Sequence, residues 1–270
     1  MGVEAVRDFD LEQYRDWFDF VALERDEAGV LEVRLHRDGG VLTDWGGDTL
    51  SEIGLMFGII GQDPGNRVVI LTGTGDWFIR AADVVPEQNA PIPAEGWLHA
   101  DIWARRLQRN LLNIEVPIVA AVNGPFELHS ELAIMSDLIV ASDTAWFQDT
   151  RHFTVGCVPG DGCMPPWMRL LGPNRGRQFL LQGLKITAAE CLERGIVAEV
   201  VPRDQVLDRA RALAAELATR TTQALRYTRI IGTREYRRNV ELDGGYGTAL
   251  QGLAAGEYWP GGKVGAGDVR

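Results

Sequence analysis

The chain has 270 residues, of which 46% are hydrophobic and 24% are charged, and its formal net charge is −11 at pH 7. This composition is ordinary for a soluble globular protein that buries a sizeable core. The acidic balance argues against a nucleic-acid partner and does not favour docking on an anionic membrane, because both need clustered basic residues.

The apolar segments and the cysteines indicate the cellular setting. No apolar run approaches the roughly 18–20 residues of a membrane span. The first ten residues are too acidic for a signal peptide. The three cysteines, Cys157, Cys163 and Cys191, are an odd number at irregular spacing. They indicate reduced thiols rather than a disulfide framework or a zinc cage, so we expect a cytoplasmic protein.

The first half of the chain alternates between strand and helix patterns. Residues 21–35 show apolar alternation around a turn at 27–29, which predicts a β-hairpin. Residues 50–60 have helical spacing, and 67–73 form an apolar run ending at glycine, typical of a strand buried on both faces. A loop is expected over 75–96, because that stretch lacks periodicity and contains three prolines.

The second half continues the alternation and then becomes helical. An amphipathic helix is expected at 97–114, and the capping pattern that begins at Thr187 predicts a further helix. Other strands are expected at 117–122, 138–142 and 197–201, and other helices at 131–135, 165–172, 174–182 and from 203 to about 253. This order predicts an α/β core over residues 1–202 and a helical region over 203–270.

Two of the four histidines, His129 and His152, lie beside acidic residues in segments rich in glycine and proline. A histidine near a carboxylate on a loop can act as a general base near neutral pH. His152 and Asp161 are the candidate dyad, and they can meet only if Gly156 and residues 159–160 fold the chain back. Two structural alternatives remain: loop histidines often pair with carboxylates for structural reasons, and Asp161 can simply form a turn.

Several segments resemble the crotonase (enoyl-CoA hydratase/isomerase) superfamily, in the order in which that family has them. They include residues 68–75 (Val-Val-Ile-Leu-Thr-Gly-Thr-Gly), 117–124 (Pro-Ile-Val-Ala-Ala-Val-Asn-Gly), 131–147, and 187–197. The resemblance covers about residues 20–253. It implies an α/β spiral of ββα turns with a helical C-terminal trimerisation region, assembled as a homotrimer or a dimer of trimers.

The family's thioester machinery is rewritten in this chain. The glycine-rich turn that usually follows Asn-Gly and holds a thioester oxyanion here reads Pro-Phe-Glu-Leu-His-Ser-Glu (125–131). The second oxyanion loop reads Ile-Arg-Ala (79–81). A narrower resemblance is to the 6-oxocamphor hydrolase type of β-diketone hydrolase. It rests on Phe-Gln-Asp-Thr-Arg-His-Phe (147–153) and Val-Pro-Gly-Asp-Gly (158–162).

This narrower resemblance implies hydrolysis of a C–C bond between two carbonyls by a retro-Claisen reaction, with no cofactor or metal. His152 matches the base and Asp161 the residue that orients it. His129 and Trp45 match donors that replace the lost backbone amides around the oxyanion. Asp149 is expected to orient a neighbouring arginine or the loop.

Five further residues are candidate substrate contacts. Leu50 and Gln251 stand where the resembling branch has a histidine and a glutamate. Arg80 lies on the former oxyanion loop and either meets an anionic substrate or faces solvent. Glu131 matches a catalytic glutamate of the hydratases, with helix capping as its structural alternative. Phe126 belongs to the rewritten turn.

The sequence therefore predicts a cofactor-independent C–C bond hydrolase that acts on a cyclic or bicyclic 1,3-diketone. The first alternative is a hydratase, isomerase or cyclase of the same fold that stabilises an enolate without hydrolysis, acting on a specialised metabolite or an acyl-CoA. The second is a non-catalytic member that serves in assembly or binding.

Overall fold

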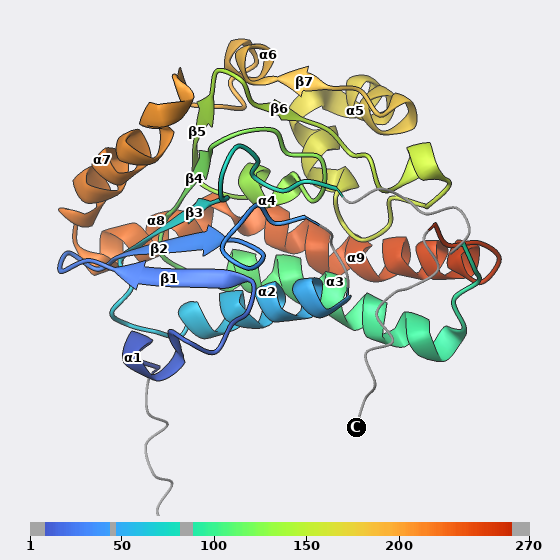
Figure 1. The fold of residues 1–270 in the computed structure, drawn as a ribbon, viewed down its shortest axis with the longest axis horizontal. Coiled ribbons are helices and arrows are strands. Elements are labelled where there is room, and N and C mark those ends of the chain that lie inside the picture. Colours follow the sequence, from blue (N-terminus) through green and yellow to red (C-terminus); the bar gives the residue numbers. More distant parts are fainter. Residues whose placement is uncertain (1–8, 44–46, 82–88, 261–270) are drawn as a thin grey trace, which may run out of the picture.

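The computed structural model describes residues 9–43, 47–81 and 89–260 (Figure 1). Its centre is a six-stranded sheet in the order β1-β2-β3-β4-β5-β8, in which only the β1–β2 pair is antiparallel. The expected hairpin supplies this pair. The strands are β1 (Val21–Arg25), β2 (Val30–Leu35), β3 (Val68–Thr72), β4 (Ile118–Val122), β5 (Leu138–Ser142) and β8 (Glu199–Val201).

Helices cover both faces of this sheet, which is why its central strands β3 and β4 are buried at every position. On β3, Val68 and Ile70 pack against helix α7 (Val206–Ala218), together with Val119 of β4. The alternate residues Val69 and Leu71 belong to the larger core on the opposite face. That face is covered by α2 (Gly47–Ile60) and α3 (Ala94–Asn113).

The C-terminal helices lie against the α/β core (Figure 1). Helix α9 (Arg234–Ala255) runs beside α3, and α8 (Thr222–Gly232) precedes it. The buried Arg229 of α8 donates to the carbonyl oxygen of Ile114 at 2.6 Å and to the Asp137 carboxylate. Asp137 also accepts from the Ile118 amide at 2.7 Å, so this arginine ties the helical region to the start of β4.

The remaining elements complete the described part of the fold. They are α1 (Leu11–Tyr14), α4 (Glu131–Ile134), β6 (Trp146–Phe147), η2 (Phe153–Val155), α5 (Met164–Gln182), β7 (Ile186–Thr187), α6 (Ala188–Glu193) and η3 (Arg203–Gln205). The capping box predicted at Thr187 is present. Within the described ranges, no helix combines the length and apolar character needed to cross a bilayer.

The structure differs from the sequence expectations in several places. The two helices expected on either side of residue 173 form one element, α5, which is kinked where Gly172 has φ +76°. Helices α2 and α3 begin at Gly47 and Ala94, each three residues earlier than expected. The pair β6–β7 was not expected, because two-residue strands carry no measurable periodicity. Part of the expected loop, residues 82–88, lies outside the described residues.

Candidate active site

Three segments after the sheet's strands bring the candidate residues together. Residues 125–131 follow β4, residues 148–152 follow β6, and the loop 158–162 precedes α5. The first two segments pair through their backbones: the Phe126 amide donates to the Trp146 carbonyl at 2.9 Å, and the Gln148 amide donates back to Phe126 at 3.0 Å. This pairing places the His129 and His152 rings 6.4 Å apart between centroids, at an interplanar angle of 85°.

His129 is held by a carboxylate two residues away. Its Nδ1 lies 2.8 Å from Oε1 of Glu131, and both side chains are buried. Burial alone would lower the pKa of His129, but the Glu131 carboxylate and then Asp161 outweigh it and raise that pKa. The backbone of His129 is left-handed, with φ +54°, which is uncommon for a residue other than glycine. Oε2 of Glu131 is buried with no hydrogen-bond partner among the described residues.

His152 has a carboxylate at each ring nitrogen. Its Nδ1 lies 2.8 and 2.9 Å from the two oxygens of Asp149, and its Nε2 lies 3.0 Å from Oδ2 of Asp161. The ring is buried. Burial would lower the pKa of His152, but the two carboxylates outweigh it and raise that pKa well above its ordinary value of 6.5. The expected His152–Asp161 pair is therefore present, with a second carboxylate behind it.

Asp161 is the point on which both imidazoles converge. Its Oδ2 lies 3.0 Å from Nε2 of His152 and 3.9 Å from Nε2 of His129. Burial would raise the pKa of Asp161, yet the two imidazoles and the backbone amide of Cys163 lower it. The backbone of Asp161 is fixed as well, since Gln108 of α3 donates to its carbonyl oxygen at 2.8 Å.

The five side chains form a row in which carboxylates and imidazoles alternate: Asp149, His152, Asp161, His129 and Glu131. When both imidazoles are protonated, three negative and two positive charges leave the row with one net negative charge. Sγ of Cys163 lies 3.5 Å from Asp149 and 3.8 Å from Nδ1 of His152. The donor atoms of Asp149, His152 and Cys163 lie within 4.8 Å of one another, but hydrogen bonds account for that spacing.

The structure places the remaining predicted residues differently. Gln251 is buried on α9 and donates to Sγ of Cys157 at 3.5 Å, beside the loop that carries Asp161. Leu50 is half-buried and packs against the main core. Trp45, the second expected oxyanion donor, lies outside the described residues.

Two of the expected substrate contacts have aromatic neighbours in the structure. Phe126 is fully buried and stacks on Phe78, with ring centroids 4.3 Å apart, so its side chain fills the core between strands. Arg80 is exposed, and its guanidinium lies 5.6 Å from the ring centroid of Trp77. The solvent-facing alternative therefore describes Arg80.

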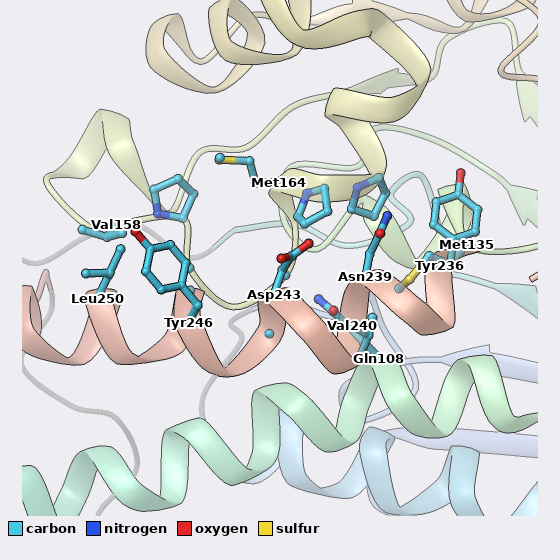
Figure 2. A pocket seen from close by; sticks show the side chains of 17 residues that line it. Gln108, Met135, Val158, Met164, Tyr236, Asn239, Val240, Asp243, Tyr246 and Leu250 are labelled. Carbon is cyan, nitrogen blue, oxygen red and sulfur yellow. The ribbon is translucent and has the colours of Figure 1, made fainter. Parts of the chain in front are cut away.

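A cavity of about 360 Å³ is lined in part by residues of the loop 158–162. Figure 2 shows residues of α9, among them Tyr246 and Leu250, facing Met164 at the start of α5 across it. Gly160 and Gly162, which flank Asp161, also line the cavity, whereas the side chains of the row do not. Its volume lies within the range of small-molecule sites.

Two positions in the site were not identified from the sequence. Asp149 was expected to orient an arginine or the loop, but its carboxylate contacts the imidazole three residues later. The three-residue spacing between Asp149 and His152 was the one feature of the sequence that could have indicated this contact. Gln108 sits on a long amphipathic helix, and nothing in the pattern distinguishes it from other polar positions of that helix.

The chain is similar to known proteins over most of its length. The sequence profile of the enoyl-CoA hydratase/isomerase family matches residues 25–242. A carnitinyl-CoA dehydratase from Proteus mirabilis is 30% identical over 240 residues, which cover 86% of each chain. An enoyl-CoA hydratase/isomerase from Mycobacterium paratuberculosis shares the fold, with a TM-score of 0.80, 22% identity, and coverage of 89% of this chain and 95% of that one.

A third similar protein is a β-diketone hydrolase from Anabaena sp. PCC 7120, whose structure contains (S)-3-oxocyclohexyl acetic acid. It is 38% identical, has a TM-score of 0.84, and is matched over 90% of this chain and 97% of that one. The profile match and these likenesses confirm the expected fold. The chain belongs to the enoyl-CoA hydratase/isomerase family, the crotonase superfamily.

Proposed function

We propose that this protein hydrolyses a C–C bond of a cyclic or bicyclic β-diketone by a retro-Claisen reaction that needs no cofactor. The observation that carries the proposal is the convergence of His152 and His129 on Asp161. The likeness to the Anabaena β-diketone hydrolase supports it.

The proposed reaction needs an activated water, an oxyanion site and a proton for the departing carbon. The His152–Asp161 pair removes a proton from water as the hydroxide adds to one carbonyl carbon. The C–C bond then breaks, and its electrons move onto the second carbonyl to form an enolate. The enolate carbon takes a proton from the pair, so the product keto acid contains both the OH and the H of one water molecule.

His129 is proposed to stabilise the oxyanion by donating a hydrogen bond, with the Trp45 indole as the second donor. The contact between His129 Nδ1 and Glu131 fixes the ring and leaves Nε2 directed to the side of Asp161. Loss of one such donor typically costs about 2.7–4 kcal/mol of transition-state stabilisation. Gln251 is a neutral hydrogen-bonding group that can bind a ketone but not transfer a proton.

The assembly proposed for this chain is a homotrimer or a dimer of trimers, as the family resemblance implies. Helix α9 exposes large apolar side chains, among them Leu242 at 65%, Tyr246 at 71% and Leu253 at 75%. Surfaces of this kind often mark sites of protein–protein contact.

A hydratase, isomerase or cyclase that stabilises an enolate is the second candidate. Oε2 of Glu131 favours it, because this oxygen is buried without a partner at the position that matches the hydratases' catalytic glutamate. The replacement of two polar groups of the diketone hydrolases by Leu50 and Gln251 also favours a hydratase, isomerase or cyclase.

A substrate panel separates the two candidates. The purified protein is incubated with cyclic 1,3-diketones, and the loss of diketone absorbance is followed alongside mass-spectrometric detection of a keto acid. Crotonyl-CoA serves as the comparison substrate. We expect turnover of at least one diketone, whereas hydration of crotonyl-CoA without turnover of any diketone would support the second candidate.

A further inference from the structure

Asp149 is the acidic residue of the row to which neither the family resemblance nor the proposed reaction assigns a task. We propose that Asp149 is a positioning residue that holds a proton on Nδ1 of His152. With that proton in place, Nε2 carries a second proton and His152 acts as the general acid. Asp161 then acts as the general base. This inference rests on the proposed function and divides its proton transfers between two named groups.

When Asp149 and Asp161 are both ionised, the geometry around His152 favours two protons on the ring. Both oxygens of Asp149 lie within 2.9 Å of Nδ1, and Oδ2 of Asp161 lies 3.0 Å from Nε2. Ionised carboxylates only accept hydrogen bonds, and a neutral imidazole has a single N–H. A neutral ring would therefore set a nitrogen lone pair against a carboxylate oxygen at one of its two ends. An imidazolium satisfies both contacts.

Asp149 is itself held in place, as a positioning residue must be. It is buried, its Oδ1 accepts from the backbone amide of Arg151 at 3.3 Å, and its Oδ2 accepts from the thiol of Cys163 at 3.5 Å. One contact comes from the segment that carries His152 itself, and the other comes from the end of the loop that carries Asp161. Rotation of Asp149 away from His152 would break them and leave a buried carboxylate poorly paired, which is costly.

The groups that face His152 from its neighbours favour the charged ring. Two of them are anionic carboxylates, Asp149 after β6 and Asp161 in the loop before α5. Cys163 and Cys157 are thiols whose pKa values are raised by burial, and His129 on the turn before α4 is an imidazole whose charged form would oppose a charge on His152. The raised pKa of His152 agrees with this arrangement.

With Asp161 as the base and His152 as the acid, every proton is accounted for over one catalytic cycle. Asp161 accepts a proton from water as the new C–O bond forms, and Nε2–H of His152 protonates the enolate carbon after the C–C bond breaks. The protonated Asp161 then returns its proton to Nε2 of His152 across their 3.0 Å contact, which restores the starting state. Asp149 keeps the Nδ1 proton throughout, so the ring delivers its proton only from Nε2.

The test uses the full-length protein labelled with ¹⁵N-histidine, which has only four histidines. In the wild type, both nitrogens of His152 should be protonated at neutral pH. In Asp149→Asn, the amide oxygen can still accept from Nδ1–H, but the negative charge is gone. We expect the pKa of His152 to fall, the basic limb of the pH–kcat profile to move to lower pH, and kcat to drop about 10–100-fold at nearly unchanged KM.

Asp204→Asn makes the same chemical change at an exposed position and should alter none of these quantities. A wild-type His152 with one bare nitrogen at neutral pH would overturn the inference, as would an unchanged His152 titration in Asp149→Asn. If Asp149→Asn does not fold, the wild-type spectrum alone decides. If no diketone is turned over, the proposed function fails, while the spectra still test the placement of the proton by Asp149.

Discussion

His152 is the residue on which the chemistry and the electrostatics of the site both depend. Its two ring nitrogens contact Asp149 and Asp161 in a buried environment, where paired charges interact more strongly than at a surface. The imidazolium and the two carboxylates stabilise one another, so the pKa of the histidine rises and the pKa values of the acids fall. Stability and activity should therefore both respond to its titration.

The raised pKa of His152 predicts a pH-dependent contribution to stability. A group whose pKa is higher in the folded state stabilises fully below its unfolded pKa, here about 6.5, and the stabilisation is lost as pH rises through the folded pKa. The lowered pKa values of Asp149 and Asp161 act at the acid end: their contribution is present above about 3.8 and is lost as pH falls through the folded values.

The difference in Tm between the wild type and His152→Gln measures this contribution. We expect it to be largest between about pH 4 and 6.5 and to shrink as the pH is raised toward 10. A difference that grows on the alkaline side would show that the ring is neutral in the folded state.

Replacement of His152 should lower kcat far more than replacement of Leu50, a non-polar residue that was also predicted to lie at the site. His152→Ala removes the proton-transfer group and should lower kcat about 10²–10⁴-fold. Leu50→Ala trims a half-buried side chain that packs on the core and should lower kcat much less. Steady-state kinetics on one diketone decide the matter, and comparable losses in the two variants would mean that the dyad is misassigned.

At the residue scale, the resemblance to the β-diketone hydrolases, together with the turn residues between His152 and Asp161, predicted the contact between these two side chains. Gly156 has φ +87° and helps to turn the chain back between the two residues. The same reasoning did not reveal that the Phe126 side chain is buried in the core, because the sequence of a turn does not say which side chain faces inward. The role of Asp149 was missed because an i,i+3 acid near a histidine is common and carries weak information by itself.

At the element scale, the loop 158–162 is fixed by contact with α9. A Cβ on Gly160 would lie 2.1 Å from the carbonyl oxygen of Gly247, so the two backbones pack where no side chain fits. Asp161 takes its position from this contact and from Gln108.

Gly160→Ala should therefore force the loop away from α9. We expect a loss of about 1–3 kcal/mol in the free energy of unfolding, the usual cost of overpacking, together with a reduced kcat. Gly245→Ala is the matched control, because a Cβ there meets nothing within 4 Å and alanine favours the helix by about 0.5–1 kcal/mol. Urea titration of both variants measures the two effects, and equal stabilities would contradict the proposed packing.

The longer elements could be predicted because their patterns are strong. The buried runs of β3 and β4 and the capping box before α6 match the structure closely. The pair β6–β7 could not be predicted, since its formation depends on tertiary pairing rather than on local pattern. The continuity of α5 through Gly172 likewise depends on packing around the kink rather than on propensity.

At the scale of the whole molecule, the exposed apolar residues of α9 predict association of several copies. Light scattering during size-exclusion chromatography should give the mass of a trimer or hexamer of the 29.8 kDa chain. Leu253→Glu places a charge on a 75%-exposed leucine and should lower that mass if α9 lies at the interface. A wild-type mass equal to a single chain would contradict the proposed assembly.

The central claim is hydrolysis of a carbon–carbon bond by water, and isotope labelling tests it most directly. A non-enolisable cyclic 1,3-diketone is incubated with the protein in H₂¹⁸O, and the product is analysed by mass spectrometry. The account predicts a ring-opened keto acid with one ¹⁸O in its new carboxyl group, formed by the wild type and nearly absent with His152→Ala. Recovery of intact diketones across the panel, under conditions in which the same protein hydrates crotonyl-CoA, would contradict it.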